Sequence, residues 1–226
     1  MQNADEPNAK SPSEPSSESP TECSTGFDPA HFPAYILCGG QSVRFGTDKA
    51  RVRIDRQPHL LRLAKSLRSQ GHETHFVADC EDRYKDLGIV TIVDVQPKSG
   101  PMAGLVSAAQ HRATYYGSGW FLLLSCDQLR WQPKYFRWLA DRVKADLAAI
   151  TYCDPDIQPI PGLYHTRIEA AAEAALALQQ LSLKRMLESS NAAVLIEENE
   201  NPRNWCFNSE AELNELLDKL QREFEL

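Results

Sequence analysis

Residues 36–50 read ILCGGQSVRFGTDKA, and the rest of the chain is organised around this stretch. The apolar run at residues 35–37 is typical of a short, buried β-strand. Gly39 and Gly40 follow it directly, and because neither residue carries a Cβ, the backbone can turn tightly and approach a ligand closely. A strand that ends in such a turn predicts a ligand-binding loop at the carboxyl end of the first strand, where open α/β sheets bind their ligands.

Two cations, Arg44 and Lys49, follow the glycine pair within ten residues. Exposed backbone N–H groups beside an Arg and a Lys bind a polyphosphate well. The stretch is not a Walker loop, because Lys49 stands between Asp48 and Ala50, and it is not a dinucleotide fingerprint, because its first two glycines are adjacent. A glycine-rich turn with solvated charges is the alternative to a phosphate-binding loop.

Composition narrows the class of protein. The chain has 226 residues, a formal charge of −7 and 42% hydrophobic residues. This length suits one domain with a substantial core, and no apolar run approaches the length of a membrane-spanning helix. We therefore expect a soluble, cytoplasmic protein with no membrane partner. The acidic balance argues against nucleic acid as the main partner, so cations for an anionic nucleotide must be gathered locally, with Lys98 as a further candidate.

The six cysteines are widely spaced, without a C-x-x-C pair or a Cys/His spacing typical of zinc. Cys38 and Cys126 follow predicted strands, where a small apolar thiol packs well. We expect these thiols to be reduced. Only Cys206 lies near the predicted chemistry, and even there we expect the thiol to serve in packing.

The first 31 residues are rich in Ser, Pro and Glu and almost free of aliphatic residues. Such a segment buries too little apolar surface to offset its ordering entropy, so residues 1–31 are predicted to be a disordered tail. The segment has neither the basic start nor the apolar stretch of a secretory signal. Residues 32–226 are expected to form one domain.

A second informative stretch, residues 94–105, reads DVQPKSGPMAGL. Its Pro and Gly residues, including Gly100 and Gly104, break regular structure before a predicted helix at residues 105–116. A loop that leads into a helix N-terminus presents free N–H groups to a ligand, and Asp94 lies at its start. A purely structural loop is the alternative.

The run WFLLL at residues 120–124 is typical of a central parallel strand that is buried on both faces. It ends in Ser125, Cys126 and Asp127. A carboxylate at this edge points into the ligand crevice, where an unpaired charge is costly. A divalent cation shared with substrate phosphates removes that cost, so Asp127 is predicted to bind magnesium. Capping of the next helix is the alternative role.

Strands and helices alternate along the chain, which predicts an α/β fold with a mostly parallel, twisted sheet and helices on both faces. Residues 158–164 are predicted to be a loop entering a further strand, and Ser209 with Glu212 forms a capping box before a last helix. The predicted strands are residues 35–37, 74–78, 89–93, 120–124, 146–152 and 192–197. The other predicted helices are residues 60–67, 131–144, 167–180 and 182–188.

The pattern L-x-G-G-x-S-x-R-[MF]-G-x-D-K-A in residues 37–50 resembles the signature of nucleotidyltransferases, and most closely that of the molybdenum cofactor guanylyltransferases. The segment GPMAG at residues 100–104 and the element QPIPGLY at residues 158–164 also resemble that family, and the likeness spans residues 34–222. It implies a single three-layer αβα domain of the Rossmann-like nucleotide-diphospho-sugar-transferase type.

The resemblance also implies a reaction. The terminal phosphate of molybdopterin, or of molybdenum-molybdopterin, attacks the α-phosphorus of GTP and releases pyrophosphate with the help of Mg²⁺. Arg44 and Lys49 would offset charge on the leaving group, and Asp127 would hold the metal. Molybdoenzymes and other cofactor-biosynthesis proteins are the further partners implied. The implied nucleotide-binding residues are Leu37, Cys38, Gly39, Gly40, Lys49, Asp94, Gly100 and Asp127.

Two departures from the family pattern stand out. The family has a small residue and Pro after the Cys-Asp pair, whereas this chain has Gln128 and Leu129. It also has Cys206 at the first Asn of the pattern N-x-N-[ST]-x-x-[DE]-L and keeps Asn208 at the second, as a candidate for substrate contact or as a plain turn residue. Another nucleotidyltransferase, acting with molybdopterin and CTP or on a sugar phosphate, and a non-catalytic GTP-binding relative are the rival interpretations.

Overall fold

The strand that precedes the glycine pair, β1 (Ala34–Leu37), lies between two parallel neighbours, β4 (Thr74–Ala78) and β6 (Trp120–Ser125). The computed structural model describes residues 32–40, 45–153, 156–190, 192–196 and 205–224. The predicted disordered tail and Arg44 lie outside these residues. The short apolar run of the sequence is therefore an inner strand of the sheet, as its composition predicts.

The main sheet of the described residues has seven strands in the order β5-β4-β1-β6-β8-β7-β9. All neighbouring strands are parallel except at β8, which runs antiparallel to both β6 and β7. The predicted mostly parallel α/β sheet is confirmed. The remaining strands are β5 (Ile92–Val93), β7 (Ala149–Cys153), β8 (Ile157–His165) and β9 (Ala192–Ile196), and β2 (Arg53–Ile54) and β3 (Gln57–Pro58) form a separate hairpin.

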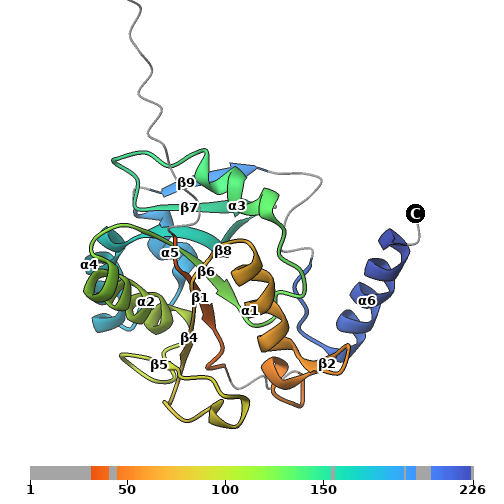
Figure 1. The fold of residues 1–226 in the computed structure, drawn as a ribbon. Coiled ribbons are helices and arrows are strands. Elements are labelled where there is room, and N and C mark those ends of the chain that lie inside the picture. The colour runs from red at the N-terminus through yellow and green to blue at the C-terminus, as the bar shows by residue number, and fades with distance from the viewer. Residues whose placement is uncertain (1–31, 41–44, 154–155, 191, 197–204, 225–226) are drawn as a thin grey trace, which may run out of the picture.

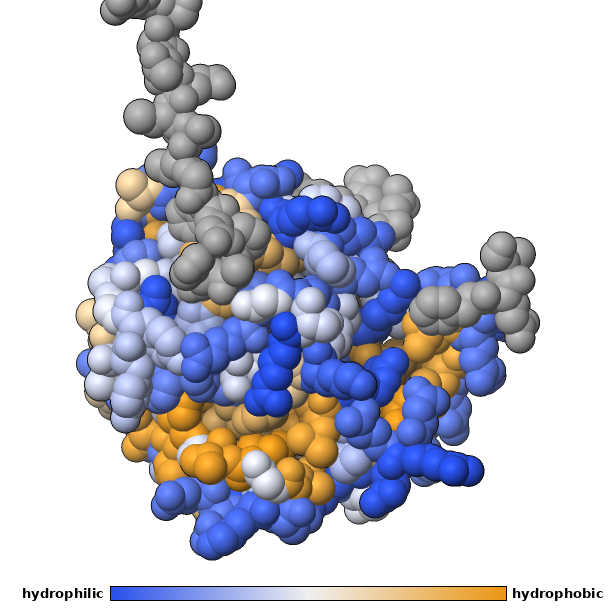
Figure 2. Space-filling view, in the orientation of Figure 1, coloured by the Kyte–Doolittle hydropathy of each residue, from blue (hydrophilic) through white to orange (hydrophobic). Residues whose placement is uncertain are grey.

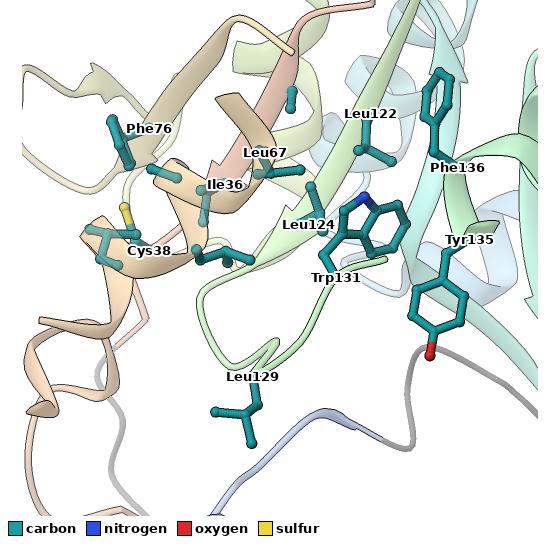
Figure 3. Close-up of a cluster of buried hydrophobic side chains, with 14 of the residues drawn as sticks. Ile36, Cys38, Leu67, Phe76, Leu122, Leu124, Leu129, Trp131, Tyr135 and Phe136 are labelled. Atoms are coloured by element: carbon teal, nitrogen blue, oxygen red, sulfur yellow. The ribbon is translucent and has the colours of Figure 1, made fainter. Parts of the chain in front are cut away.

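Helices cover both faces of this sheet and give three layers (Figure 1). Side chains alternate between the faces along a strand, so Leu122 and Leu124 of β6 pack in one buried cluster, whereas Phe121 and Leu123 pack in another. The first cluster, drawn in part in Figure 3, includes buried residues of α1 (His59–Ser69), α3 (Pro133–Ala140) and α6 (Glu210–Phe224). The second cluster includes residues of α2 (Pro101–Tyr116), α4 (Glu169–Ala177) and α5 (Leu183–Glu188).

The predicted start of α2 is wrong by one helical turn. The helix begins at Pro101, with Gly100 as its N-cap, and so includes Gly104. Pro is tolerated at the first helical position, because the N–H that it lacks would have no intrahelical partner there. Pro101 and Gly104, which were predicted to break regular structure, therefore lie in the first turn of the helix.

Other boundaries also differ from those predicted. Residues 158–164 are part of β8 rather than a loop, because they pair with β7 and β6. The strand expected at 89–93 is reduced to β5, and the helix expected at 131–144 ends at Ala140. Short 3₁₀-helices lie at Lys49–Arg51 (η2), Lys85–Leu87 (η3) and Thr166–Ile168 (η4).

The surface and the cysteines bear on the expectations from composition. Figure 2 shows an apolar area low on the face in view, in the part of the molecule where Figure 1 places β5. Three valines in or near β5, Val90, Val93 and Val95, are exposed. None of the described helices has the length and apolarity needed to span a bilayer. The described cysteines, Cys38, Cys80, Cys126, Cys153 and Cys206, are free thiols as predicted.

Candidate nucleotide-binding site

A cleft of about 440 Å³ opens where the carboxyl ends of β1, β4 and β6 meet the N-terminus of α2. This is the edge at which open α/β sheets bind ligands. Of the residues predicted to bind a nucleotide, all except Cys38 line this cleft. The lining residues are Leu37, Gly39, Gly40, Lys49, Val77, Asp79, Asp94, Lys98, Gly100, Pro101, Gly104, Ser125, Cys126, Asp127 and Ile160.

The first glycine of the pair lies against the neighbouring strand. A Cβ at Gly39 would come within 2.8 Å of the backbone nitrogen of Asp79 and 3.1 Å of Cα of Ala78. Backbone atoms cannot move aside as a flexible side chain can, so this position accepts only glycine. The loop therefore crosses the carboxyl end of β4 in direct contact, and this contact closes one wall of the cleft.

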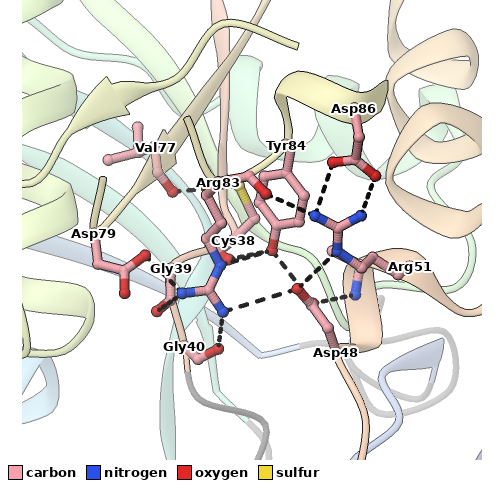
Figure 4. Close-up of polar contacts among 11 residues, drawn as sticks. Cys38, Gly39, Gly40, Asp48, Arg51, Val77, Asp79, Arg83, Tyr84 and Asp86 are labelled. Atoms are coloured by element: carbon pink, nitrogen blue, oxygen red, sulfur yellow. Dashed lines mark hydrogen bonds and ion pairs between the residues drawn. The ribbon is translucent and has the colours of Figure 1, made fainter. Parts of the chain in front are cut away.

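The carbonyl groups of the glycine pair are bound by one guanidinium group. Arg83 donates hydrogen bonds to the carbonyl oxygen of Gly39 at 3.3 Å and to that of Gly40 at 3.0 Å. The same side chain forms a 2.6 Å ion pair with Asp79 (Figure 4). In a trans peptide the N–H points away from the C=O, so fixing the Gly39 carbonyl also directs the N–H of Gly40 to the opposite side.

Tyr84, next to Arg83 in the sequence, also holds the glycine loop. Its hydroxyl donates to the carbonyl oxygen of Cys38 at 2.7 Å and lies 3.3 Å from Asp48 Oδ1. Burial raises the pKa of this hydroxyl well above its ordinary value, so Tyr84 stays a neutral donor. Residues 83–84 therefore hold the backbone of residues 38–40 from one side and leave the other side to the cleft.

Asp48 and Lys49, the two charged residues at the end of the signature, have different roles in the structure. Asp48 is the N-cap of η2 and accepts from the N–H of Ala50 at 3.0 Å, and its other carboxylate oxygen lies 3.6 Å from Arg51 and 3.8 Å from Arg83 (Figure 4). Asp48 is thus used within the fold, whereas Lys49 lines the cleft.

Lys49 joins three of the predicted site residues. Its Nζ lies 3.8 Å from Asp127 Oδ2 and donates a 3.0 Å hydrogen bond to Asn208 Oδ1. Asp127 also accepts a hydrogen bond from the hydroxyl of Ser125. Residues from the glycine loop, the end of β6 and the segment before α6 therefore meet at one end of the cleft.

Asp94 lies on the opposite wall. Its Oδ1 is buried and has no hydrogen-bond partner among the described residues. Burial and, to a smaller extent, the charge of Asp79 raise the pKa of this carboxyl to about 6. Asp94 lines the cleft, and the N-terminal turn of α2 lies beside its buried Oδ1, since a Cβ on Gly104 would come 3.5 Å from that oxygen.

The two thiols near the cleft are not activated. Cys38 is buried behind the cleft wall, where its Sγ donates to the carbonyl oxygen of Val77. Burial raises the pKa of Cys38 well above its ordinary value and that of Cys126 to about 12. Both thiols are therefore protonated near neutral pH, which excludes a thiolate nucleophile at these two positions.

Asp79 and Ile160, which line the cleft, and Arg83, which binds the loop carbonyls, are not among the residues predicted from the sequence. Asp79 follows β4 as Asp127 closely follows β6, so the rule that identified Asp127 also applies to Asp79. Ile160 lies within the predicted QPIPGLY element. Arg83 gave no local signal, because its partners lie up to 44 residues away in the sequence.

The carboxylate ligands in the cleft suit a magnesium ion that binds together with a nucleotide. No cluster of three or more His, Cys, Asp or Glu side chains among the described residues is arranged to hold a metal ion by itself. Mg²⁺ is usually held by one or two carboxylates together with substrate phosphates and water. Asp127 and Asp94, which both line the cleft, supply such carboxylates.

Comparisons with known proteins agree with this geometry. Residues 34–194 match the family described as the MobA-like NTP transferase domain. The chain is 25% identical over 162 residues to a probable molybdenum cofactor guanylyltransferase of Bacillus mycoides, covering 69% of this chain and 79% of that protein. A second protein of that name, from Flavobacterium johnsoniae, is 24% identical over 184 residues, with 80% and 94% covered.

Among solved structures, molybdopterin-guanine dinucleotide biosynthesis protein A of Archaeoglobus fulgidus is similar with a TM-score of 0.71 and 18% identity, covering 84% of this chain and 100% of that one. This likeness shows the fold. The residues that match the family include the glycine loop, the strand-end carboxylates Asp79 and Asp127, and the N-terminus of α2. The chain belongs to the MobA-like NTP transferase domain family and is a nucleotidyltransferase.

Proposed function

We propose that the chain transfers GMP from GTP to the terminal phosphate of molybdopterin, with or without bound molybdenum. A phosphate oxygen of the pterin attacks the α-phosphorus of GTP, the bond from that phosphorus to the bridging oxygen of the β-phosphate breaks, and pyrophosphate leaves. The meeting of Lys49, Asp127 and Asn208 at one end of the cleft carries this proposal. The names of the similar proteins support guanine and molybdopterin as the substrates.

The residues of the cleft would act by position and charge. The Gly40 N–H and the N-terminus of α2 suit the phosphates, because a helix N-terminus carries partial positive charge and free N–H groups. Lys49 would offset negative charge on the leaving pyrophosphate, and Asp94 would accept a hydrogen bond from the nucleotide. Arg44, outside the described residues, stays a candidate for the same charge as Lys49.

A magnesium ion would supply electrostatic stabilisation of the phosphates. Asp127 would hold it, with Asp94 as a second carboxylate in reach of the nucleotide. A phosphate nucleophile is already anionic near neutral pH, so the reaction needs no side-chain general base. The protein's contribution is then the alignment of two phosphate-bearing substrates and the balance of their charge.

Nucleotide selectivity tests the proposal. The protein would be incubated with molybdopterin, Mg²⁺ and each of GTP, CTP, ATP and UTP, and pyrophosphate would be followed. We expect release with GTP. Release with CTP instead would assign a cytidylyl transfer on the same fold. No release with any nucleotide, despite GTP binding, would support the non-catalytic interpretation.

Substitution of the proposed metal ligand is the second test. Asp127→Asn is expected to lower pyrophosphate release at least about 10³-fold, because the metal position loses its charged ligand. Asp141→Asn is the matched control, since Asp141 is exposed at the end of α3. Both variants should keep the wild-type circular dichroism. Full activity in the Asp127 variant would remove this residue from the metal site.

A further inference from the structure

Two short segments, residues 127–129 and 205–207, run antiparallel beside the site, and we call their pairing the C-terminal clasp. Gln128 lies directly opposite Cys206 in this pairing. These are two of the positions at which the chain departs from the pattern of its relatives. Departures that are 78 positions apart in the sequence therefore contact each other in the fold.

Leu129, the third position at which the chain departs from that pattern, supplies one of the two backbone bonds of the clasp. The N–H of Leu129 donates to the carbonyl oxygen of Trp205 at 2.7 Å, and the N–H of Phe207 donates to that of Asp127 at 3.1 Å. Proline has no N–H, so a chain with Pro at position 129 cannot form the first of these bonds. Leu129, which stands where the family pattern has proline, thus ties the loop after β6 to the segment before α6.

Side chains strengthen the same pairing. The two bonds flank Gln128 and Cys206, which makes them a non-hydrogen-bonded pair, the kind in which opposed side chains approach most closely. The thiol of Cys206 donates to Gln128 Oε1 at 3.2 Å, and Gln128 Nε2 donates to the carbonyl oxygen of Arg130 at 2.7 Å. Gln128 is only 1% exposed, so these hydrogen bonds are made by a buried amide, and their loss is costly.

Aromatic residues on the C-terminal segment seat the clasp in the core. Phe207 is fully buried, with its ring centroid 5.4 Å from that of His59 and 5.6 Å from that of Phe45. The ring of Trp205 has the guanidinium of Arg130 4.8 Å and the ammonium of Lys219 4.7 Å from its centroid. The segment is therefore held by the glycine loop, by α1 and by α6.

The next residue along the chain is Asn208. Its N–H donates to Glu212 Oε2 at 2.7 Å, and the N–H of Glu212 donates to the hydroxyl of Ser209 at 3.2 Å. The backbone on both sides of Asn208 is thus fixed, by the clasp before it and by the cap of α6 after it. Its side chain accepts from Lys49, which lies beside Asp127.

We propose that the C-terminal clasp is a positioning device, which holds Asn208 next to Lys49 and Asp127 on the side of the site that receives the second, phosphate-bearing substrate. This inference rests on the proposed function. Gln128, Leu129 and Cys206 act through Asn208 and touch no substrate themselves. The three residues act on one pairing, because Leu129 donates one of its two backbone bonds and the side chains of Gln128 and Cys206 bond to each other.

Leu129→Pro tests the clasp, with Leu129→Ala as its matched control. Alanine keeps the N–H but removes more of the side chain than proline does, so a pure packing effect is larger in the control. Proline at this place suits the extended backbone of Gln128 before it. We expect the proline variant to raise KM for molybdopterin about tenfold, to leave Kd for GTP within about twofold, and to speed amide exchange at residues 206–208.

A double-mutant cycle separates positioning from general loss of structure. Asn208→Ala should raise KM for molybdopterin to the same degree, and its combination with Leu129→Pro should be no worse than either single variant. Gln128→Met, which keeps the volume but removes both amide hydrogen bonds, serves if the proline variant does not fold, and should raise the same KM at least about threefold. Unchanged KM in these variants, or multiplied effects in the combination, would overturn the proposal.

Failure of the proposed function would give a different result. If the wild-type protein releases no pyrophosphate, the transfer reaction falls, and the exchange measurement alone decides the clasp. Faster exchange at residues 206–208 in Leu129→Pro, but not in Leu129→Ala, would support the clasp as the holder of Asn208. Equal exchange in both variants would overturn it.

Discussion

Lys49 is the residue on which most of the site converges, since it contacts both Asp127 and Asn208 from the first loop. Its neighbour in the signature, Asp48, instead caps η2 and lies close to the side chains of Arg51 and Arg83. Of the two adjacent charged residues in the signature, Lys49 therefore lines the ligand cleft and Asp48 stabilises the loop that carries Lys49. These separate roles explain why the signature has an aspartate followed directly by a lysine.

Lys49→Ala is expected to weaken GTP binding about 10- to 100-fold, as for the loss of a hydrogen bond to a charged group. GMP binding should weaken by no more than about threefold, because GMP lacks the β- and γ-phosphates. Calorimetry with both nucleotides makes the comparison, and Lys85→Ala, at an exposed position, is the control. Equal losses for GTP and GMP would remove Lys49 from the pyrophosphate.

Asp94 gives a prediction about pH. Its pKa is raised to about 6, above the ordinary value near 4, so the folded state binds this proton more tightly than the unfolded state. The stabilisation from protonated Asp94 is complete below pH 4 and is lost as pH rises through 6. Asp94→Asn should therefore raise Tm relative to wild type at pH 8 and have little effect at pH 4.

The same variant should bind GTP more weakly at pH 8, because the amide cannot supply the second acceptor oxygen of the carboxylate. Thermal unfolding at the two pH values and GTP titration make both measurements. A Tm difference that is the same at pH 4 and pH 8 would contradict the assignment of a raised pKa to this group. Gain in stability with loss of binding is the usual exchange at a functional site.

At the scale of elements, the network around Arg83 connects η3 and the end of β4 with the glycine loop (Figure 4). Because one guanidinium binds two successive loop carbonyls, the direction of the loop depends on a single side chain. Lysine cannot replace it, since its ammonium lacks the planar fork of donors.

Arg83→Lys is expected to weaken GTP binding about tenfold, while Arg83→Ala should also lower the stability by about 1–3 kcal/mol through the carbonyls and carboxylate left without a donor. Denaturant unfolding and GTP titration measure the two effects. Arg142→Lys, at an exposed residue beyond α3, is the control for the substitution itself. Unchanged GTP affinity in Arg83→Lys would show that the loop is held by its other contacts.

At the scale of the whole molecule, β6 organises the two cores, because it has buried side chains on both faces. Leu122→Ala should lower the free energy of unfolding by about 2–5 kcal/mol, through lost burial and the cavity left behind. Leu178→Ala, at a residue 69% exposed, should change it by less than about 0.5 kcal/mol. A small effect at Leu122 would mean that the sheet tolerates a cavity at its centre.

The sequence predicts the strands that are mostly apolar, such as β1 and β6, because burial on both faces leaves a continuous apolar run. It places α2 one turn late, since Gly and Pro have a different meaning at a helix N-terminus than in its interior. The strand at residues 158–164 was missed for a related reason: two prolines hide an extended segment whose partners lie elsewhere in the chain.

The candidate site shows the same division. Residues whose role follows from position after a strand, such as Asp127, are predicted from local pattern. Residues whose role follows from contacts across the fold, such as Arg83 and the Gln128–Cys206 pair, are not, because no local property of the sequence specifies which distant segment a loop will meet. The structure supplies that information through β4 and through the segment before α6.

The bond between Lys49 and Asn208 joins residues 159 positions apart. A chain leaving the ribosome at about 5–20 residues per second presents the glycine loop many seconds before residue 208 follows. Every residue that lines the cleft, the last of them Ile160, is made before Asn208 and the segment that seats it. Synthesis order alone thus delays the complete site until the sheet beneath it has been made, and an interrupted chain would hold nucleotide contacts without a finished place for the second substrate.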